Sequence, residues 1–386
     1  MKIYLIAGEP SGDMLGARLM RALKEKDENI SFLGVGGDNM QKEGLNSLFD
    51  ITDLAIMGLV EVIPSIPKVL RHIKNTVNDI IEKKPDIVIT IDSWSFSARI
   101  HKKLRKLGIK VTQLHYVAPQ VWAWKKKRAK TMYKYIDHLL TLFPNEPKYF
   151  TPYNLSTDFV GHPAIESSMI NIDTCSFKEK YHIKDNQKIV LILPGSRHNE
   201  VANLLPSFIE TANKLKENDK NLFFILPTVK TVEKRVRNML ETLNSDILVL
   251  TTQEERYQAS RLASLAIAAS GTVALELAII SVPHLVAYKV PSLTAFIARH
   301  FTNIKYVNLT NILLDKPIVP ELLQEECNLE NLYKTSNQLL DTSSLLYNNE
   351  KQGFQELRKV LGVGELKPSQ KSAEIILNLI HQKKAN

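Results

Sequence analysis

An aspartate directly follows an apolar segment in the first half of the chain. Ile87 to Ile91 is typical of a buried strand, and Asp92 comes next. Open α/β sheets bind ligands at the carboxyl ends of their strands. Partial desolvation there raises the pKa of a carboxyl group toward the range useful for removing a proton from a hydroxyl. Asp92 is therefore a candidate general base, although an Asp at such a position also commonly caps the following helix.

The first strand-turn-helix unit carries carboxylates in its turn. Its glycines are spaced by four residues, unlike the G-x-G-x-x-G of a dinucleotide site. Glu9 and Asp13 would repel a diphosphate, so this loop is better suited to accepting hydrogen bonds from the hydroxyls of a sugar. The alternative is that Asp13 caps the helix starting near Met14 and that Glu9 is simply exposed.

Two turns in the second half suit an anion. Pro194-Gly195-Ser196-Arg197 and Ser270-Gly271-Thr272 each lie between a predicted strand and a predicted helix. Backbone N–H groups at a helix start, together with an Arg, bind phosphate. Glu276 follows Thr272 by one helical turn and could accept hydrogen bonds from a ribose. Each turn could instead be an ordinary turn or cap, but two of them in one half favour a nucleotide diphosphate.

An amphipathic segment runs from Ile63 to Ile81, with basic residues beside its apolar stripe. Most such stripes face a core. The basic flank also suits anionic lipid headgroups, so membrane contact is the alternative. The residues expected to make that contact are Ile63, Ile66, Val69, Leu70 and Ile73.

Trp122 and Trp124 precede a run of lysines and an arginine. Aromatic and cationic residues in this order could bind nucleic acid, anchor the chain at a membrane interface, or form a packed pair beside a solvated helix start. Because no RNA-recognition signature accompanies them, nucleic acid is the least favoured of the three.

Strands and helices alternate along the whole chain, which predicts the α/β class with parallel sheets covered by helices on both faces. A Gly-His-Pro sequence at 161–163 suits a junction between two similar halves. We therefore expect domains at 1–163 and 164–347, and C-terminal helices at 348–386 that pack across the boundary. The strands expected are Lys2–Ala7, Ile30–Gly34, Asp86–Ile91, Lys110–Tyr116, His138–Thr141, Lys188–Leu193, Leu222–Leu226, Ile247–Leu250, Leu265–Ala268 and His284–Ala287.

The composition of the 386 residues excludes a small stapled scaffold and a disordered chain. Fifty Lys and Arg against 41 Asp and Glu give a net charge of +9, which favours anionic partners. Cys175 and Cys327 form no C-x-x-C pattern, so neither a disulfide framework nor a zinc site is predicted. No run approaches the roughly 18 apolar residues of a spanning helix, and we expect a soluble or peripheral protein.

In their order along nearly the whole chain, these motifs resemble those of the lipid-A-disaccharide synthases, bacterial glycosyltransferases. The motifs that carry the resemblance are Ala7-Gly8-Glu9-Pro10-Ser11-Gly12-Asp13, Gly36-Gly37 with Met40, Met57 to Val62, Ile91-Asp92, Val117 to Trp124, Gly161-His162-Pro163, Pro194 to Arg197 with Glu200, Ser270-Gly271-Thr272 with Glu276, and Asn311 with Glu321 and Gln324.

The resemblance implies a fold of the glycosyltransferase B type, in which two Rossmann-like domains face a cleft. It implies transfer of 2,3-diacylglucosamine from UDP-2,3-diacylglucosamine to the 6-hydroxyl of 2,3-diacylglucosamine 1-phosphate (lipid X), with inversion and release of UDP. No metal or cofactor is expected, and Arg197 would offset the charge of the leaving group.

The resemblance also assigns residues. Asp92 matches the position of the base. The acceptor sugar would contact Glu9, Ser11, Asp13 and His115. The nucleotide would contact Gly195, Ser196, Arg197, Glu200, Ser270, Gly271, Thr272, Glu276, Asn311, Glu321 and Gln324.

The chain departs from the family at one place and leaves other functions open. The family often has Asp-Ala-Pro-Asp-Phe where this chain has Asp92-Ser93-Trp94-Ser95-Phe96, so Ser95 stands in place of the family's second acid. Acylated substrates imply peripheral attachment to the inner face of the cytoplasmic membrane, and the family suggests a homodimer with exchanged C-terminal segments. The alternatives are another transferase or an epimerase acting on UDP-N-acetylglucosamine, and a membrane- or RNA-binding protein without turnover.

Overall fold

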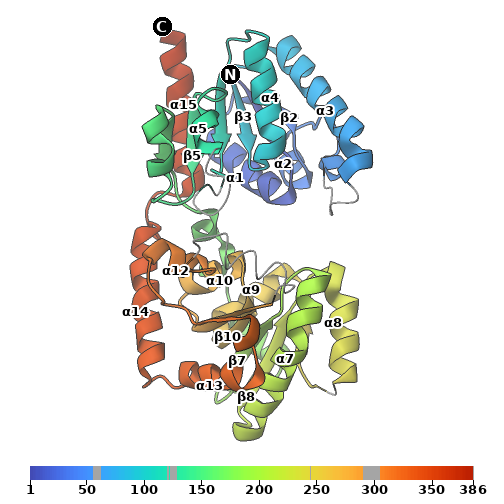
Figure 1. Cartoon of the computed structure of the whole chain (residues 1–386), viewed down its shortest axis with the longest axis vertical. Helices are drawn as coiled ribbons and strands as arrows, with labels where there is room; N and C mark the ends of the chain where they lie inside the picture. The colour runs from blue at the N-terminus through green and yellow to red at the C-terminus, as the bar shows by residue number, and fades with distance from the viewer. Residues whose placement is uncertain (55–61, 120, 122–127, 244, 290–304, 386) are drawn as a thin grey trace. The chain divides into compact units, whose positions relative to one another are not determined.

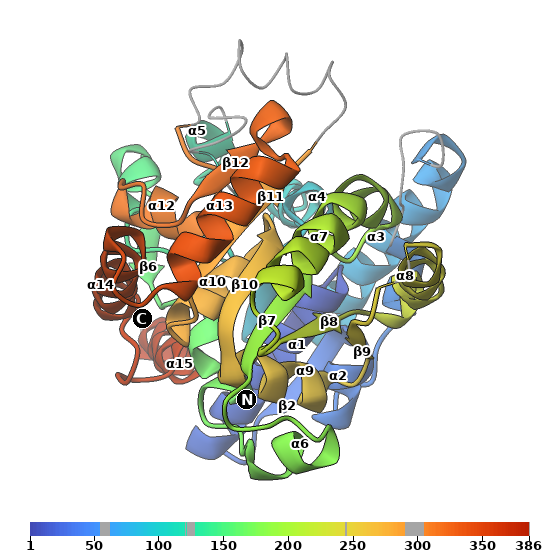
Figure 2. The same ribbon diagram turned by 90° about the horizontal axis from the view of Figure 1, so that it is seen from below.

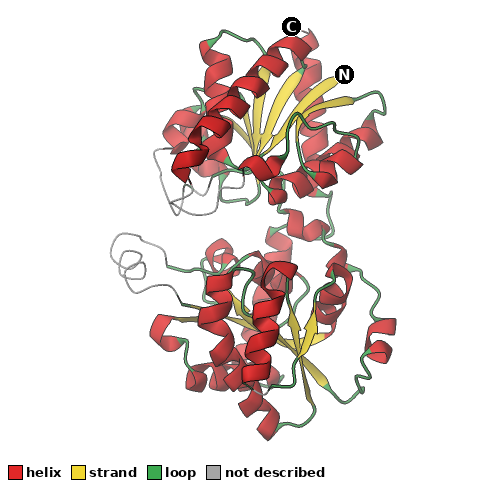
Figure 3. Cartoon of the chain, turned by 90° about the vertical axis from the view of Figure 1, so that its right-hand side faces the viewer, coloured by secondary structure: helices red, strands yellow, loops and turns green. Residues whose placement is uncertain are grey.

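The chain folds into two compact units in the computed structural model (Figure 1). The structure describes residues 1–54, 62–119, 121, 128–243, 245–289 and 305–385, except for the side chains of 62–66, 384 and 385. Unit 1 consists of Met1–Pro163 and Gly364–Asn386, and unit 2 of Ala164–Val363. The backbone therefore passes from one unit to the other twice. In each unit, helices lie on both sides of a sheet (Figure 3).

Unit 1 contains a six-stranded parallel sheet in the order β2-β1-β3-β4-β5-β6. The order reverses between β1 and β3, because β2 lies on one side of β1 and the later strands follow on the other. Every residue of β3 is buried, as expected for a strand covered on both faces. The strands are β1 (Lys2–Ala7), β2 (Ser31–Val35), β3 (Ile87–Ile91), β4 (Thr112–Tyr116), β5 (His138–Thr141) and β6 (Ser156–Phe159).

The helices of unit 1 pack their apolar residues on this sheet. One of them, α15, comes from the C-terminal segment and packs against α1, where Ala373, Ile376 and Ile380 are buried. The helices described are α1 (Pro10–Lys26), α2 (Asp38–Lys42), α3 (Val62–Lys83), α4 (Trp94–Lys106), α5 (Ala129–Met132) and α15 (Pro368–Ala385), with 3-10 turns η1 (Ile51–Leu54), η3 (Pro147–Tyr149) and η4 (Thr151–Tyr153).

Unit 2 repeats this plan, with the strand order β12-β11-β10-β7-β8-β9, all parallel. The order reverses between β7 and β10, which run side by side in Figure 2. Buried apolar residues form a cluster on each face of the sheet. The strands are β7 (Lys188–Leu193), β8 (Leu222–Pro227), β9 (Leu248–Leu250), β10 (Ala263–Ala269), β11 (His284–Tyr288) and β12 (Glu321–Leu323).

Helix α14 covers the β11 side of unit 2. Phe354 stacks on His284 with 5.3 Å between ring centroids, and Glu350 is fully buried beside them. The helices described in unit 2 are α6 (Cys175–Lys180), α7 (His198–Asn218), α8 (Lys230–Thr242), α9 (Gln253–Leu262), α10 (Thr272–Ile279), α12 (Leu309–Leu314), α13 (Leu329–Leu340) and α14 (Leu345–Val360), with the 3-10 turns η6 (Ser168–Ile170) and η7 (Gln324–Glu326); η5 (Pro163–Glu166) spans the first passage between the units.

The predicted fold class is confirmed, because each half is a Rossmann-like parallel sheet between helices. All ten expected strands are present with end points within two residues, but the sequence did not reveal β6 and β12. Strand β6 is polar and lies at an edge, and β12 has only three residues. Within the described ranges, no helix is both long and apolar enough to cross a membrane.

Candidate functional site

Asp92 lies at the switch point of unit 1, where ligands of open α/β sheets bind. It follows β3 directly, and its N–H donates to the Tyr116 carbonyl at 2.9 Å. Asp92 and Ser93 both have a left-handed backbone conformation, with φ of 56° and 43°. The Asp92 carboxylate accepts from the Ser93 N–H at 2.8 Å through Oδ1. It does not cap α4, because the N-cap residue of that helix is Ser93.

The surroundings of Asp92 suit a proton acceptor. Burial is the largest cause that raises the pKa of Asp92, and the charge of Glu9 raises it further. The Ser93 N–H and the Ser11 hydroxyl lower it. Ser11 donates to Oδ2 at 3.4 Å, a weak hydrogen bond that an acceptor hydroxyl can replace.

Glu9 and Ser11 lie at the same edge of the sheet as Asp92. β1 and β3 pair with Ala7 opposite Ile91, so the residues after both strands are neighbours. Both side chains are exposed. Glu9 Oε1 accepts from the Ser93 hydroxyl at 2.5 Å. The exposed carboxylate of Glu9 and the partly buried carboxylate of Asp92 thus lie at one edge of the sheet, where both can accept hydrogen bonds.

Asp13, expected to contact the acceptor, is instead engaged by the protein. Its side chain is buried, at 3% exposure, inside α1. Oδ1 accepts from the N–H groups of Gly37 (2.7 Å) and Met40 (3.0 Å), and Oδ2 accepts from the N–H (3.0 Å) and the side-chain amide (2.8 Å) of Asn39. Asp13 therefore holds the N-terminus of α2 against α1, and we do not propose it as an acceptor-binding residue.

We likewise do not propose His115, which was expected to contact the acceptor sugar, as an acceptor-binding residue. It is fully buried, its Nδ1 is 2.7 Å from the Thr90 hydroxyl, and its ring packs 4.7 Å from that of Trp94. Burial lowers the pKa of His115 well below its usual value, so the imidazole is neutral. The same Thr90 hydroxyl bonds His101 at 2.7 Å. The His101 and His115 rings pack against Trp94, the first residue of α4, and so help to fix the turn at Asp92.

The turn after β7 lies at the switch point of unit 2. Gly195 has φ of 106°, and a Cβ there would lie 2.3 Å from Oε2 of Glu200. The Glu200 carboxylate accepts from the N–H groups of Ser196 (3.1 Å) and Arg197 (3.3 Å) and pairs with the Arg197 guanidinium at 2.9 Å. Glu200 therefore shapes this turn, and the two predicted phosphate-binding N–H groups are bonded to it. The Arg197 side chain is 79% exposed.

The turn after β10 lies beside the first, since β7 and β10 are paired. Helix α10 begins after Gly271, which has no side chain to cap it. A Cβ on Gly271 would meet nothing within 4 Å. Gly271 and Thr272 are exposed, and the Ser270 hydroxyl donates to the Val307 carbonyl at 3.2 Å. The first turn of α10 is therefore an open, uncapped helix N-terminus of the kind that binds phosphate. Glu276 lies in the same helix, partly buried.

Asn311 and Glu321, predicted to bind the nucleotide, are bonded to each other. Asn311 Nδ2 donates to Glu321 Oε1 at 2.8 Å, and Asn311 is 1% exposed. Asn311 Oδ1 accepts from the N–H groups of Ile318 and Val319. Glu321 also accepts from two N–H groups, those of 307 and 308, at 2.9 and 3.0 Å. Both side chains therefore tie α12 to β12. Gln324 follows β12 with φ of 54° and is partly buried.

Helix α3 divides the predicted membrane residues. Ile73 is 4% exposed and packs in the core of unit 1, with Val69 partly buried against it, so the prediction of membrane contact is wrong for Ile73. Leu70 is 54% exposed. The side chains of Ile63 and Ile66 lie outside the described residues, as do Trp122, Trp124 and most of the 57–62 motif.

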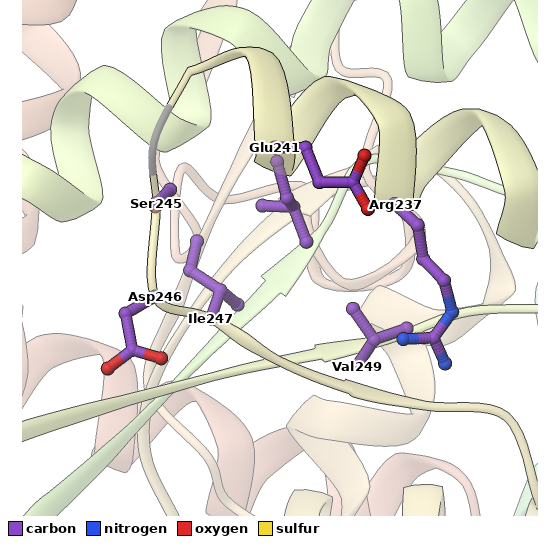
Figure 4. Close-up of a pocket in the computed structure, with 7 residues that line it drawn as sticks. Arg237, Glu241, Ser245, Asp246, Ile247 and Val249 are labelled. Carbon is purple, nitrogen blue, oxygen red and sulfur yellow. The ribbon is translucent and has the colours of Figure 1, made fainter.

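A pocket of about 390 Å³ lies at the β9 edge of unit 2 (Figure 4). None of the catalytic or binding residues predicted from the sequence lines it. Arg237, which lines it, is paired with Glu233 at 2.9 Å in the same helix. Strand β9 is separated from β7 by β8 in the sheet, so this pocket does not belong to the switch point. Its other lining residues are Leu240, Glu241, Ser245, Asp246, Ile247 and Val249.

The sequence analysis missed Ser93, which contacts both carboxylates of the unit 1 edge. The available signal was the register of two strands: Glu9 lies two residues after β1, and Ser93 lies two residues after β3. That signal depends on knowing that β1 and β3 are adjacent and paired with Ala7 opposite Ile91.

Comparisons with known proteins agree along the whole chain. A family model described as lipid-A-disaccharide synthetase matches residues 3–376. The lipid-A-disaccharide synthase of Paramagnetospirillum magneticum is 44% identical over 387 residues, which cover 100% of this chain and 99% of the relative. The protein of the same name from Rhodospirillum centenum is 41% identical and covers 98% and 94%.

Solved structures share the fold at much lower identity. A putative UDP-N-acetylglucosamine 2-epimerase from Listeria monocytogenes has a TM-score of 0.66 and 15% identity, covering 100% of this chain and 97% of that one. The UDP-GlcNAc 2-epimerase from Neisseria meningitidis bound to UDP-GlcNAc has a TM-score of 0.65 and 12% identity, covering 99% of this chain and 100% of that one. A glycosyltransferase from Rickettsia africae has a TM-score of 0.58 and 14% identity, covering 98% of each chain. At these identities the likeness concerns the fold alone.

Proposed function

The chain belongs to the lipid-A-disaccharide synthase family and is a glycosyltransferase of lipid A biosynthesis; within that activity, we propose that Asp92 is the general base and that unit 2 binds UDP. The acceptor is 2,3-diacylglucosamine 1-phosphate and the donor is UDP-2,3-diacylglucosamine. The epimerase alternative is not favoured, because relatives named as synthases match at 34–44% identity whereas the structures named as epimerases match at 12–16%.

The reaction we propose is a single displacement. The acceptor 6-hydroxyl oxygen forms a bond to the anomeric carbon of the donor sugar, and the bond from that carbon to the UDP oxygen breaks. The hydroxyl proton passes to Asp92 Oδ2, and UDP leaves with the bonding electron pair. The configuration inverts because attack and departure take place on opposite faces.

The observation that carries the assignment of Asp92 is its place directly after β3 at the switch point, with only a weak hydrogen bond to Oδ2. A general base must have an oxygen that a substrate hydroxyl can reach. Glu9 supports the assignment, because its exposed carboxylate can accept a second hydroxyl of the acceptor sugar and orient the 6-hydroxyl.

For UDP, we propose the two turns at the switch point of unit 2. The uncapped N-terminus of α10 suits the diphosphate, and Arg197 can offset the charge of the leaving UDP. Glu276 is proposed for the ribose hydroxyls. When phosphate approaches, the Arg197 guanidinium has to exchange Glu200 for the ligand or contact both. Gln324 stays a proposed nucleotide contact.

The experiment is UDP release by the purified protein, with and without the acceptor, for wild type and Asp92→Asn. We expect release that requires the acceptor and falls at least a hundredfold in the variant, a factor within the range of general-base catalysis, about 10²- to 10⁴-fold. UDP binding, measured by calorimetry, should be unchanged because unit 2 is intact. Acceptor-independent turnover would instead support an epimerase or hydrolase.

We also propose that the protein attaches peripherally to the anionic inner face of the cytoplasmic membrane through α3. Leu70 is exposed there among the exposed cations Lys68, Arg71 and Lys74. Leu70→Asp should weaken sedimentation with vesicles containing anionic lipid, whereas Leu107→Asp should not. Leu107 is a matched control, since it is 53% exposed in the same unit but lies at the end of α4. Equal binding of both variants would contradict the proposal.

The homodimer with exchanged C-terminal segments also stays a proposal. In this structure α15 packs on α1 of the same chain, with Lys26 and Glu374 paired at 2.9 Å. Light scattering of the wild type tests it: a monomeric mass at micromolar concentration would contradict it.

A further inference from the structure

Ser93 occupies the N-cap of α4 but does not act as a cap. A serine at this position ordinarily accepts a hydrogen bond from an N–H of the first helical turn. Here it makes no such bond. Its hydroxyl instead donates to Glu9 Oε1 at 2.5 Å, across the boundary between two strand ends. The side chain therefore serves the carboxylate rather than the helix.

The backbone around Ser93 is built to hold this orientation. Ser93 has φ of 43°, a left-handed conformation that is uncommon outside glycine. Its N–H donates to Asp92 Oδ1 at 2.8 Å, and the Ser97 hydroxyl donates to the Asp92 carbonyl at 3.0 Å. Trp94, the next residue, is buried at 9% exposure. The turn is thus held at both ends.

The partner loop leaves room for this contact. A Cβ on Gly8 would lie 3.2 Å from the Ser93 Cβ and 3.3 Å from its hydroxyl oxygen. Such contacts are tighter than ordinary van der Waals distances, so a side chain at position 8 would push against Ser93. Glu9 therefore meets Ser93 next to Gly8, whose missing side chain leaves space for the Ser93 side chain.

The consequence concerns the two carboxylates. Ser93 donates its N–H to Asp92 and its O–H to Glu9. Glu9 Oε2 has no hydrogen bond to a described residue, so it can accept from a substrate hydroxyl. Without the Ser93 hydroxyl, an exposed Glu side chain would leave this edge for water, since it has three rotatable bonds and no other hydrogen-bond partner among the described residues.

We propose that Ser93 is a positioning residue that holds Glu9 beside Asp92, so that Glu9 binds a hydroxyl of the acceptor sugar while Asp92 removes the proton of another. The inference rests on the proposed role of Asp92. Ser93 itself does not touch the reacting atoms. Its effect is transmitted through Glu9, both by the position of the carboxylate and by its charge.

The charges around Asp92 make the proposal measurable. Burial and Glu9 raise the pKa of Asp92. The other titratable groups nearby are turned elsewhere: Asp13 on α1 bonds α2, and His115 on β4 is neutral and bonds Thr90. If Ser93 keeps Glu9 in place, losing its hydroxyl lets the Glu9 charge move away and lowers the pKa of Asp92.

The test is a double-mutant cycle of Ser93→Ala and Glu9→Gln, read out as kcat, the KM for the acceptor and the pH profile of kcat/KM. Ser93→Ala should raise the acceptor KM about tenfold, the loss expected for a hydrogen bond to a charged group. Its acid limb should move to lower pH. Glu9→Gln should move the limb in the same direction, and the double variant should move it no further than Glu9→Gln alone.

Ser95→Ala is the matched control, since Ser95 is exposed two residues away on α4 and has no described bond to either carboxylate. It should reproduce the wild-type KM and acid limb, and thermal unfolding should show all variants folded. An unshifted acid limb in Ser93→Ala, or shifts that add in the double variant, overturns the role of Ser93 when Asp92→Asn is inactive. Retained activity in Asp92→Asn overturns the assignment of the base and this inference with it.

Discussion

Removal of the Asp13 carboxylate should destabilise unit 1 without removing an acceptor contact. Asp13→Ala deletes the acceptor of hydrogen bonds from Gly37, Asn39 and Met40. Loss of an N-cap costs about 0.5–2 kcal/mol, and buried N–H groups left unpaired cost about 1–3 kcal/mol each. Because part of α2 can relax toward water, we expect a loss of about 3–5 kcal/mol in the free energy of unfolding of unit 1.

The assay is denaturant unfolding followed by circular dichroism, with each unit treated as its own transition, because a two-domain chain need not unfold in two states. Asp13→Asn keeps one acceptor oxygen and should lose about half as much. Glu9→Gln, at the exposed edge of the same turn, should stay within about 0.5 kcal/mol of wild type. Below the transition, the acceptor KM of both Asp13 variants should be within a few-fold of wild type.

The opposite pattern would refute this reasoning. If Asp13→Ala unfolds at the wild-type denaturant concentration but raises the acceptor KM tenfold or more, the carboxylate binds the sugar and does not hold α2. The sequence-based expectation of an acceptor contact would then be correct, and the hydrogen bonds to α2 would contribute little to stability.

Three further changes have defined outcomes. Gly195→Ala should lower the melting temperature of unit 2 by about 2–10 °C, from roughly 1–3 kcal/mol of backbone strain, whereas Gly271→Ala should leave it nearly unchanged because its Cβ meets nothing; equal melting temperatures would contradict the clash with Glu200. Burial raises the pKa of Glu350 above its usual 4.5. The stability that Glu350 contributes is therefore present below pH 4.5 and is lost as the pH rises through the folded-state pKa. The melting temperature of Glu350→Gln minus that of the wild type should grow from about pH 4.5 to 8, and a constant difference would refute this prediction. Ile73→Ala should cost about 2–5 kcal/mol in chemical denaturation because it leaves a cavity, and a loss below about 0.5 kcal/mol would place Ile73 at the surface.

The pattern of the sequence predicts most of the fold, because buried parallel strands are continuous apolar runs. β3 is an example, with all five residues apolar or β-branched and buried. β6 escapes the same reasoning, since Ser156–Phe159 is an edge strand whose side chains alternate between exposed and partly buried. Its pairing with β5 is a property of the assembled sheet and not of its own four residues.

The sequence likewise predicts only part of the candidate site. Asp92 and the turns at 194–197 and 270–272 could be placed because strand ends are recognisable and strand ends carry ligands. The engagement of Asp13 could not be read, because its partner is the N-terminus of a helix 24 to 27 residues away. The bond of Asn311 to Glu321 was hidden in the same way. Polar residues of ligand-binding type, taken alone, do not reveal whether the protein itself already occupies them.

The packing of α15 on α1 has a consequence for biosynthesis. Unit 1 begins at the first residue, but its last helix emerges from the ribosome only after all of unit 2 has been made. At about 5–20 residues per second, the nascent first domain waits roughly 10–40 s without the helix that covers α1. A chain that ends just before Pro368 therefore contains all of unit 2 but lacks the helix that packs on α1, so we expect chaperones or proteases to recognise its incomplete unit 1.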